Sequence, residues 1–233
     1  MPALHTPLLT SESRTEAEMA RSYRHIRQAI GYLALAFPFL LLVGQPLLSL
    51  LGWEPDCAIK ATISDYYHSH HLRDIFVGVL LLLGAFLIAY IGPEKNISWR
   101  HNDDLWSTLA GLAVIGVALV PTTEYNAPIT LGGQIHLAFA STFFLILAYF
   151  CFCLFTRSAP GQPMTPGKKK RNTVYKACGW IIVVSIGLIA LYHVPKIGLG
   201  LERFKPIFWL ESACVWAFSF SWLVKGEAWL QDQ

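Results

Sequence analysis

Six separate blocks of apolar residues divide this 233-residue chain, and no other feature limits its fold as strongly. The blocks are 29–51, 75–92, 105–120, 131–155, 177–194 and 206–224. Each is close to the roughly 20 residues that an α-helix needs to cross about 30 Å of hydrocarbon. Water-soluble cores do not repeat this pattern six times, and here 54% of the residues are hydrophobic and only 14% are charged. The sequence predicts an all-α membrane protein, a six-transmembrane helix bundle.

Lys and Arg residues are divided unevenly between the segments that join these blocks. Thirteen of the 18 lie on the side that carries both ends of the chain, and the dense run at 168–171 is among them. Because positively charged loops stay in the cytoplasm, both termini are predicted to be cytoplasmic, in a cell membrane that we expect to be the bacterial inner membrane. The basic run is interpreted as a solvated loop against anionic lipid headgroups, and no nucleic-acid partner is predicted.

The first 28 residues are predicted to form a cytoplasmic segment with a short amphipathic helix on the inner membrane surface. Ser13 and Glu16 have the spacing of a capping box, and apolar residues recur beyond them at helical intervals opposite three arginines. A transmembrane domain is expected over residues 29–225, followed by a cytoplasmic tail over 226–233.

Two further patterns concern the geometry of the spans. Gln45-Pro46 predicts a kink near the end of the first span. Small residues give the second and third spans surfaces on which helices can approach closely. These residues are Gly78, Gly84, Ala110, Ala113 and Gly116.

Two ionisable residues lie inside the predicted spans. His136 and Glu211 are each about five residues, or roughly 7–8 Å, from the outer ends of the fourth and sixth spans. An ionisable side chain at membrane depth costs roughly a few kcal/mol, so each requires a partner or a function. The polar stretch 64–74 and Glu124 lie on the same outer side. The sequence therefore predicts a polar site near the outer leaflet.

Imidazole and carboxylate groups are the ligands that Zn²⁺ takes in hydrolytic sites. His68, His136 and Glu211 are the predicted metal ligands, with Asp74 as an alternative carboxylate. A bound Zn²⁺ would lower the pKa of its water to about 7 and supply a hydroxide beside the lipid headgroups. We therefore hypothesise a zinc-dependent hydrolase that cleaves a lipid amide or ester, with membrane lipids as its partners.

The other polar residues of the outer side receive roles in this hypothesis. Ser64 and Asp74 are candidates for stabilising an oxyanion or moving a proton, and Glu211 is also a catalytic candidate. Arg73 could hold an anionic headgroup, and Tyr67 is a candidate substrate contact, with interfacial packing as the alternative. Three further histidines, at 70, 71 and 193, are interpreted as solvated or headgroup-facing.

Several stretches resemble a group of uncharacterised bacterial membrane proteins with six spans. They are 63–78, with its Arg73-Asp74-Ile75-Phe76-Val77-Gly78 core, His136-Leu137-Ala138-Phe139-Ala140, and Phe208-Trp209-Leu210-Glu211. The resemblance extends over nearly the whole chain. It implies a six-span fold and brings no known activity with it.

A second, partial resemblance rests on a Ser-x-x-x-His element formed by Ser64 and His68, with Asp74 as the aspartate that follows at a shorter spacing. This element is similar to that of the alkaline ceramidases and adiponectin receptors, a superfamily of membrane-embedded zinc hydrolases. The resemblance implies zinc and hydrolysis of a lipid amide. The late His-x-x-x-His pair of that superfamily is absent, since the last span offers Glu211 instead, and six spans are predicted here rather than seven.

Three other interpretations of the polar residues stay open. His136 and Glu211 could pair with each other and fix helix packing without any chemistry. With Asp74 they could form the pathway of a proton- or cation-coupled transporter or channel, although the inner halves of the spans are almost wholly apolar. A non-catalytic membrane sensor or assembly factor is the third.

The zinc hypothesis can be tested directly. Purified protein is expected to contain near-stoichiometric Zn²⁺, and His68→Ala or His136→Ala should remove it because each substitution deletes a ligand. Elemental analysis of the purified protein measures this. Wild-type protein that is carefully prepared and holds no metal would contradict the hypothesis.

Overall fold

A computed structural model describes residues 11–92, 98–124, 127–158, 161, 163–192 and 200–229, with side chains from residue 18 onward except at 20 and 23. The described residues contain helices and no strand. The six long helices are α1 (Ser11–Leu50), α2 (Leu72–Ala89), α3 (Asp103–Leu119), α4 (Leu131–Tyr149), α5 (Pro166–Tyr192) and α6 (Pro206–Lys225). Four short helical segments join or extend them: η1 (Ser64–His68), η2 (Trp99–His101), the π-helical η3 (Phe150–Leu154) and η4 (Glu202–Phe204).

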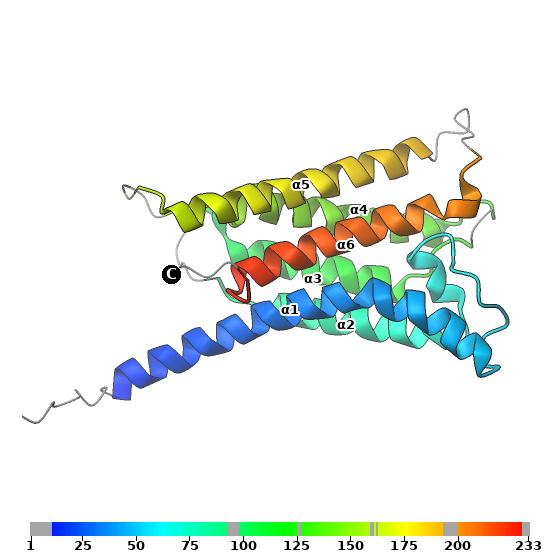
Figure 1. The fold of residues 1–233 in the computed structure, drawn as a ribbon, viewed down its shortest axis with the longest axis horizontal. Helices are drawn as coiled ribbons and strands as arrows, with labels where there is room; N and C mark the ends of the chain where they lie inside the picture. Colours follow the sequence, from blue (N-terminus) through cyan, green and yellow to red (C-terminus); the bar gives the residue numbers. More distant parts are fainter. Residues whose placement is uncertain are drawn as a thin grey trace, which may run out of the picture.

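The six helices run in alternating directions along the bundle (Figure 1), and their contacts form a closed ring. Each helix packs against the next one in the chain, and α6 closes the ring against α1. At one end of the bundle, the Gln28 side chain donates to the carbonyl of Gly226 at 3.0 Å, and Arg24 pairs with Glu227 at 3.0 Å. We call this the terminal end. The opposite end, which carries residues 51–71 and 200–205, is called the loop end.

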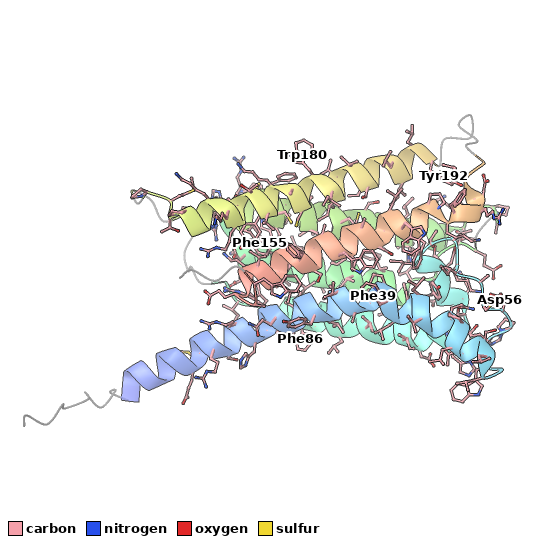
Figure 2. All side chains as sticks on the ribbon, in the orientation of Figure 1. Phe39, Asp56, Phe86, Phe155, Trp180 and Tyr192 are labelled. Atoms are coloured by element: carbon pink, nitrogen blue, oxygen red, sulfur yellow. The ribbon has the colours of Figure 1, made fainter. Side chains whose placement is uncertain are left out.

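Five helices of the described chain are long and apolar enough to cross a membrane. They are Arg24–Leu50, Leu72–Ala89, Leu131–Leu154, Pro166–Tyr192 and Pro206–Lys225, while α3 is shorter at 17 residues. Large apolar side chains cover the outside of the bundle, as shown by Trp180, which is 61% exposed and points away from it (Figure 2). The chain is therefore a multi-pass integral membrane protein.

Two sequence predictions need correction at the terminal end. A single helix runs through all 40 residues of α1, so the amphipathic segment is continuous with the first span and is not a separate helix. The reason is that residues 11–30 contain neither Gly nor Pro to end it. The basic run at 168–171 lies in the first turns of α5 and not in a loop, because Thr165 accepts a hydrogen bond from the Lys168 amide at 3.1 Å and starts the helix there.

The helix α1 runs to the loop end and is bent in its second half (Figure 1). Pro38 and Pro46 lie inside the helix, and neither has the backbone N–H that an intrahelical hydrogen bond requires. The neighbouring Gln45 is fully buried and donates to the carbonyl of Asp56 at 2.7 Å. The predicted kink at Gln45-Pro46 thus lies where α1 turns into the loop that covers the loop end.

Aromatic side chains fill the terminal half of the ring. Trp222 is fully buried, and its ring contacts those of Tyr90, Phe150, Phe155 and Phe218 at centroid distances of 5.1–5.6 Å. These rings come from the end of α2, from the end of α4 and from α6. The interior of the terminal half is therefore packed mainly with aromatic side chains.

Small residues let α2 and α3 approach closely. The sequence predicts this approach, but only some of the small residues that it singles out take part in it. A Cβ added to Gly111 would lie 2.7 Å from the carbonyl oxygen of Gly84 and 3.2 Å from the backbone nitrogen of Ile88. Gly116 instead faces the Phe139 ring of α4. Gly78 is exposed, and a Cβ there would meet nothing within 4 Å, so it makes no such contact.

Gly111→Ala is expected to destabilise the bundle, because the new methyl group meets backbone atoms that cannot rotate away. The cost should be about 1–3 kcal/mol, the usual range for overpacking a core. Thermal unfolding in detergent measures it, with Gly78→Ala on α2 as the control that leaves the melting temperature unchanged or slightly higher. Equal melting temperatures for both variants would contradict the close approach.

Candidate functional site

The loop of residues 51–71 is fastened across the loop end by buried polar contacts. Glu54 is only 4% exposed, and its carboxylate accepts hydrogen bonds from the amides of His71 at 2.8 Å and Leu72 at 3.4 Å, where α2 begins. Free N–H groups at a helix start require such acceptors. On the other side, the amide of Phe208 in α6 donates to the carbonyl of Ala61 at 3.1 Å. The loop is therefore held against both α2 and α6.

A reciprocal pair of hydrogen bonds starts η1. The Thr62 amide donates to Asp65 Oδ2 at 3.1 Å, and the Asp65 amide donates to Thr62 Oγ1 at 2.9 Å. This is the pattern of a capping box, here with aspartate in place of glutamate. Asp65 is 8% exposed, and the sequence analysis did not select it. The Thr-x-x-Asp spacing is the signal that could have identified it.

His136 is held by hydrogen bonds at both ring nitrogens. Its Nδ1 lies 2.8 Å from the carbonyl oxygen of Val120, and its Nε2 lies 3.0 Å from Ser64 Oγ. A carbonyl only accepts, so Nδ1 carries the proton, and the neutral ring accepts the Ser64 hydroxyl through Nε2. The Val120 carbonyl is available because α3 ends at Leu119. The result is a serine bonded to a buried, oriented imidazole that is 3% exposed.

Glu211 reaches the same segment from α6. Its Oε2 accepts a hydrogen bond from the Ile63 amide at 2.6 Å, next to Ser64. The two ionisable residues found inside predicted spans, His136 and Glu211, thus contact adjacent residues of the outer loop. They do so through the loop and not as a direct His–Glu hydrogen bond, since their side chains bond to Val120, Ser64 and Ile63.

A cavity of about 410 Å³ opens beside this cluster, and we call it the loop-end cavity. Its polar lining residues are Thr62, Ser64, Asp65, Thr122, Thr123, Glu124, His136, Tyr192 and Glu211. Tyr192 stands at the loop end of α5 (Figure 2). The remaining wall includes Leu137 of α4 and Ile189 of α5, and Leu137 is 55% exposed on the outside of the bundle. The cavity therefore has a polar floor and an apolar side next to the surface that faces lipid.

A second pocket, of about 290 Å³, lies at the mouth of this cavity. It shares Asp65 and Glu124 with the cavity, and Lys60, His68 and Lys205 add positive or titratable groups. His68 Nε2 donates to the carbonyl of Thr122 at 2.9 Å, which leaves Nδ1 for a second partner. That nitrogen faces Glu124 Oε1 at 3.9 Å and not His136.

The other predicted site residues lie elsewhere. Arg73 donates to the Tyr67 hydroxyl at 3.2 Å and lies 4.8 Å from the centre of its ring, so these two residues contact each other, but neither lines the loop-end cavity. Asp74 is exposed at the start of α2, outside the cavity. His70 is exposed and His71 stacks on Trp53 at 5.5 Å. His193 lies outside the described residues.

The arrangement does not form the predicted zinc ligand set. In the part of the chain that the structure describes, no three His, Cys, Asp or Glu residues group closely enough to hold a metal ion. His136 presents its acceptor nitrogen to Ser64, and His68 Nδ1 lies 3.9 Å from Glu124 Oε1. Asp74 is outside the cavity. What the geometry brings together is Ser64, His136 and Glu211.

Burial raises the pKa of Asp65 above its ordinary value of 3.8, while hydrogen bonds from Thr62 and the positive charges of His68 and Lys60 act in the opposite direction. The folded protein therefore binds this proton more tightly than the unfolded chain. The stability that Asp65 contributes is present at low pH and is lost as the pH rises from about 3.8 through the raised pKa.

Asp65→Asn should remove the loss of folding stability that wild type suffers as the pH rises. Asparagine keeps an oxygen that can accept from the Thr62 amide and carries no charge, so the variant should gain stability relative to wild type as the pH rises from about 4 to about 7. Melting temperatures at stepped pH measure the difference, and Asp74→Asn, which removes an exposed carboxylate, controls for net charge. Parallel profiles for wild type and Asp65→Asn would contradict the effect of burial.

Comparison with known proteins finds no relative of this chain. No protein-family model, no curated protein and no solved structure matches the chain. The function must therefore be inferred from the site itself, which is a serine–histidine pair and a carboxylate around a cavity at the loop end of a multi-pass membrane protein.

Proposed function

We propose that this chain is a six-span membrane hydrolase that cleaves an ester or amide bond of a lipid at the outer leaflet, with Ser64 as nucleophile and His136 as general base. One observation carries the proposal. The Val120 carbonyl fixes the tautomer of His136, so Nε2 faces Ser64 Oγ as an acceptor at 3.0 Å. A nucleophile bonded to a base, which is itself oriented by a third group, is the common arrangement of covalent hydrolases.

The reaction follows from these contacts. Ser64 Oγ attacks the acyl carbonyl of the lipid while His136 Nε2 takes the hydroxyl proton. The imidazolium then gives this proton to the leaving alcohol or amine, and water, activated by the same nitrogen, releases the acid from Ser64. Glu211 is a positioning residue in this scheme, since it accepts from the Ile63 amide and holds the backbone that carries Ser64.

The lining of the loop-end cavity supports a lipid as the substrate. Leu137 and Ile189 give it an apolar side at the surface of the bundle, where an acyl chain can enter from the bilayer. The pocket at its mouth carries Lys60, Lys205 and acidic residues, which suit a polar headgroup. The scissile bond would then lie between the two, next to Ser64.

The orientation belongs to the same proposal. The excess of Lys and Arg supports a cytoplasmic terminal end, which places the loop end and Ser64 at the outer face. At 17 residues α3 extends roughly 25 Å, and a modest thinning of the bilayer would let it cross as the sixth span. Its packing between α2 and α4 supports this crossing.

The structure favours this reading over a transporter or channel. Below Ser64 and Glu211 the next void measures only about 40 Å³, and apolar side chains such as Phe76 and Phe143 surround it. The aromatic cluster around Trp222 fills the interior beyond it. A conducted ion would have to cross this dry region without a polar partner.

Ser64 should react with a fluorophosphonate probe. Its oxygen would bond to phosphorus and displace fluoride, and mass spectrometry would locate the adduct on Ser64. Ser64→Ala should abolish labelling and lower hydrolysis of a fluorogenic long-chain ester by at least about 10³-fold, and His136→Gln should lower it by about 10²–10⁴-fold. Ser69→Ala, at a buried serine of the same loop, should leave both unchanged.

The outcome also separates this mechanism from the zinc-dependent version. A chelator should leave the serine mechanism intact and should stop a zinc-dependent one. If Ser64→Ala retains ester hydrolysis, or if another residue carries the probe, the proposed nucleophile is wrong.

A further inference from the structure

A group of basic side chains meets at the terminal end, far from the loop-end cavity. Arg27 of α1, Arg157 after η3 and Lys225 of α6 lie around the carboxylate of Asp103, and Lys168 of α5 lies near Lys225. We call these four cations the basic cluster. Phe155 lies at this end of the bundle (Figure 2). Its ring lies 5.6 Å from the Lys225 ammonium, and its carbonyl accepts a hydrogen bond from Lys168 at 2.8 Å.

The carboxylate of Asp103 already has partners for both oxygens. Oδ1 accepts from Arg157 at 2.8 Å, and Oδ2 accepts from the Tyr90 hydroxyl at 3.4 Å. Asp103 is only 2% exposed. It therefore neutralises about one of the positive charges of the cluster, and Arg157 is the cation that contacts it.

Arg27 and Lys225 form no ion pair within the described residues. The Arg27 guanidinium donates to the Tyr90 hydroxyl at 3.3 Å, and its buried Nε has no acceptor among the residues described. The Lys225 ammonium contacts the Phe155 ring, and the charges that act on it are Asp103 and three cations. Glu227, the nearest carboxylate in sequence, pairs with Arg24 at 3.0 Å.

Such an arrangement is costly unless an anion joins it. Like charges repel strongly where water is scarce, and a buried N–H without an acceptor is a further source of instability. The Arg157 side chain is 21% exposed, so the cluster can be reached from the surface. A phosphate group offers several acceptor oxygens and a charge that matches a guanidinium beside an ammonium.

We infer that the basic cluster binds an anionic phosphate group, either in the headgroup of an acidic phospholipid or as a free phosphate ion, with Arg27 and Lys225 as its principal contacts. The site stands apart from the proposed hydrolase centre and does not depend on it. It shares only Lys168 with the basic run of α5, and its other cations come from α1, from the segment after η3 and from α6, which only the fold brings together.

Full-length protein, stripped of lipid in a neutral detergent, is titrated with phosphatidylglycerol, with phosphatidylcholine and with inorganic phosphate, and binding is followed by native mass spectrometry and by the melting temperature. Arg27→Gln and Lys225→Gln each remove one contact. Lys225→Arg keeps the charge, and Lys169→Gln removes one exposed charge from α5 as the matched control.

Wild type and Lys169→Gln should bind the anionic ligand with the same affinity as each other. Arg27→Gln and Lys225→Gln should each bind it at least about tenfold more weakly, the loss expected for one charged hydrogen bond. Lys225→Arg should restore binding. A response to phosphatidylglycerol alone assigns the lipid as the source, and a response to inorganic phosphate assigns the free ion. No binding of either by wild type, or equal losses in Lys169→Gln and both Gln variants, would overturn the inference.

Discussion

His136 donates through Nδ1 to the carbonyl of Val120 and accepts through Nε2 from Ser64, so one buried side chain joins α4 to the end of α3 and to η1. Glu211 adds α6 to the same point through the Ile63 amide. A buried polar group is stable only when it is hydrogen-bonded. The contacts that satisfy these two residues therefore also decide where the outer loop lies, and the position of Ser64 depends on them.

The two ends of the bundle differ in charge and are separated by an interior of mainly apolar side chains. At the loop end, carboxylates and imidazoles outnumber the lysines and line an accessible cavity. At the terminal end, Arg27, Arg157 and Lys225 share one carboxylate, Asp103. Between them, aromatic rings pack around the buried Trp222. This separation lets each end serve its own ligand, and it suits a protein that holds or cleaves molecules more than one that conducts them.

Much of the fold could be predicted because hydropathy and helix signals are local. All six helices occur near the predicted blocks, and His136 and Glu211 reach the same level at the loop end. Two errors arose where a local signal was missed: nothing ends the helix between Ser11 and the first span, and Thr165-Pro166 starts α5 before the basic run. Asp65 was overlooked because its capping role is visible only as a Thr-x-x-Asp spacing.

The sequence by itself determined a helical, multi-pass membrane protein with ionisable residues near one end, because the length and hydrophobicity of each span are properties of neighbouring residues. Only the tertiary structure decided which of those residues meet. Ser64 faces His136, whereas the Nδ1 of His68 faces Glu124 and Asp74 stays outside the cavity. The physical reason is that a helix presents each side chain according to its rotation about its own axis, and that rotation is set by packing against other helices.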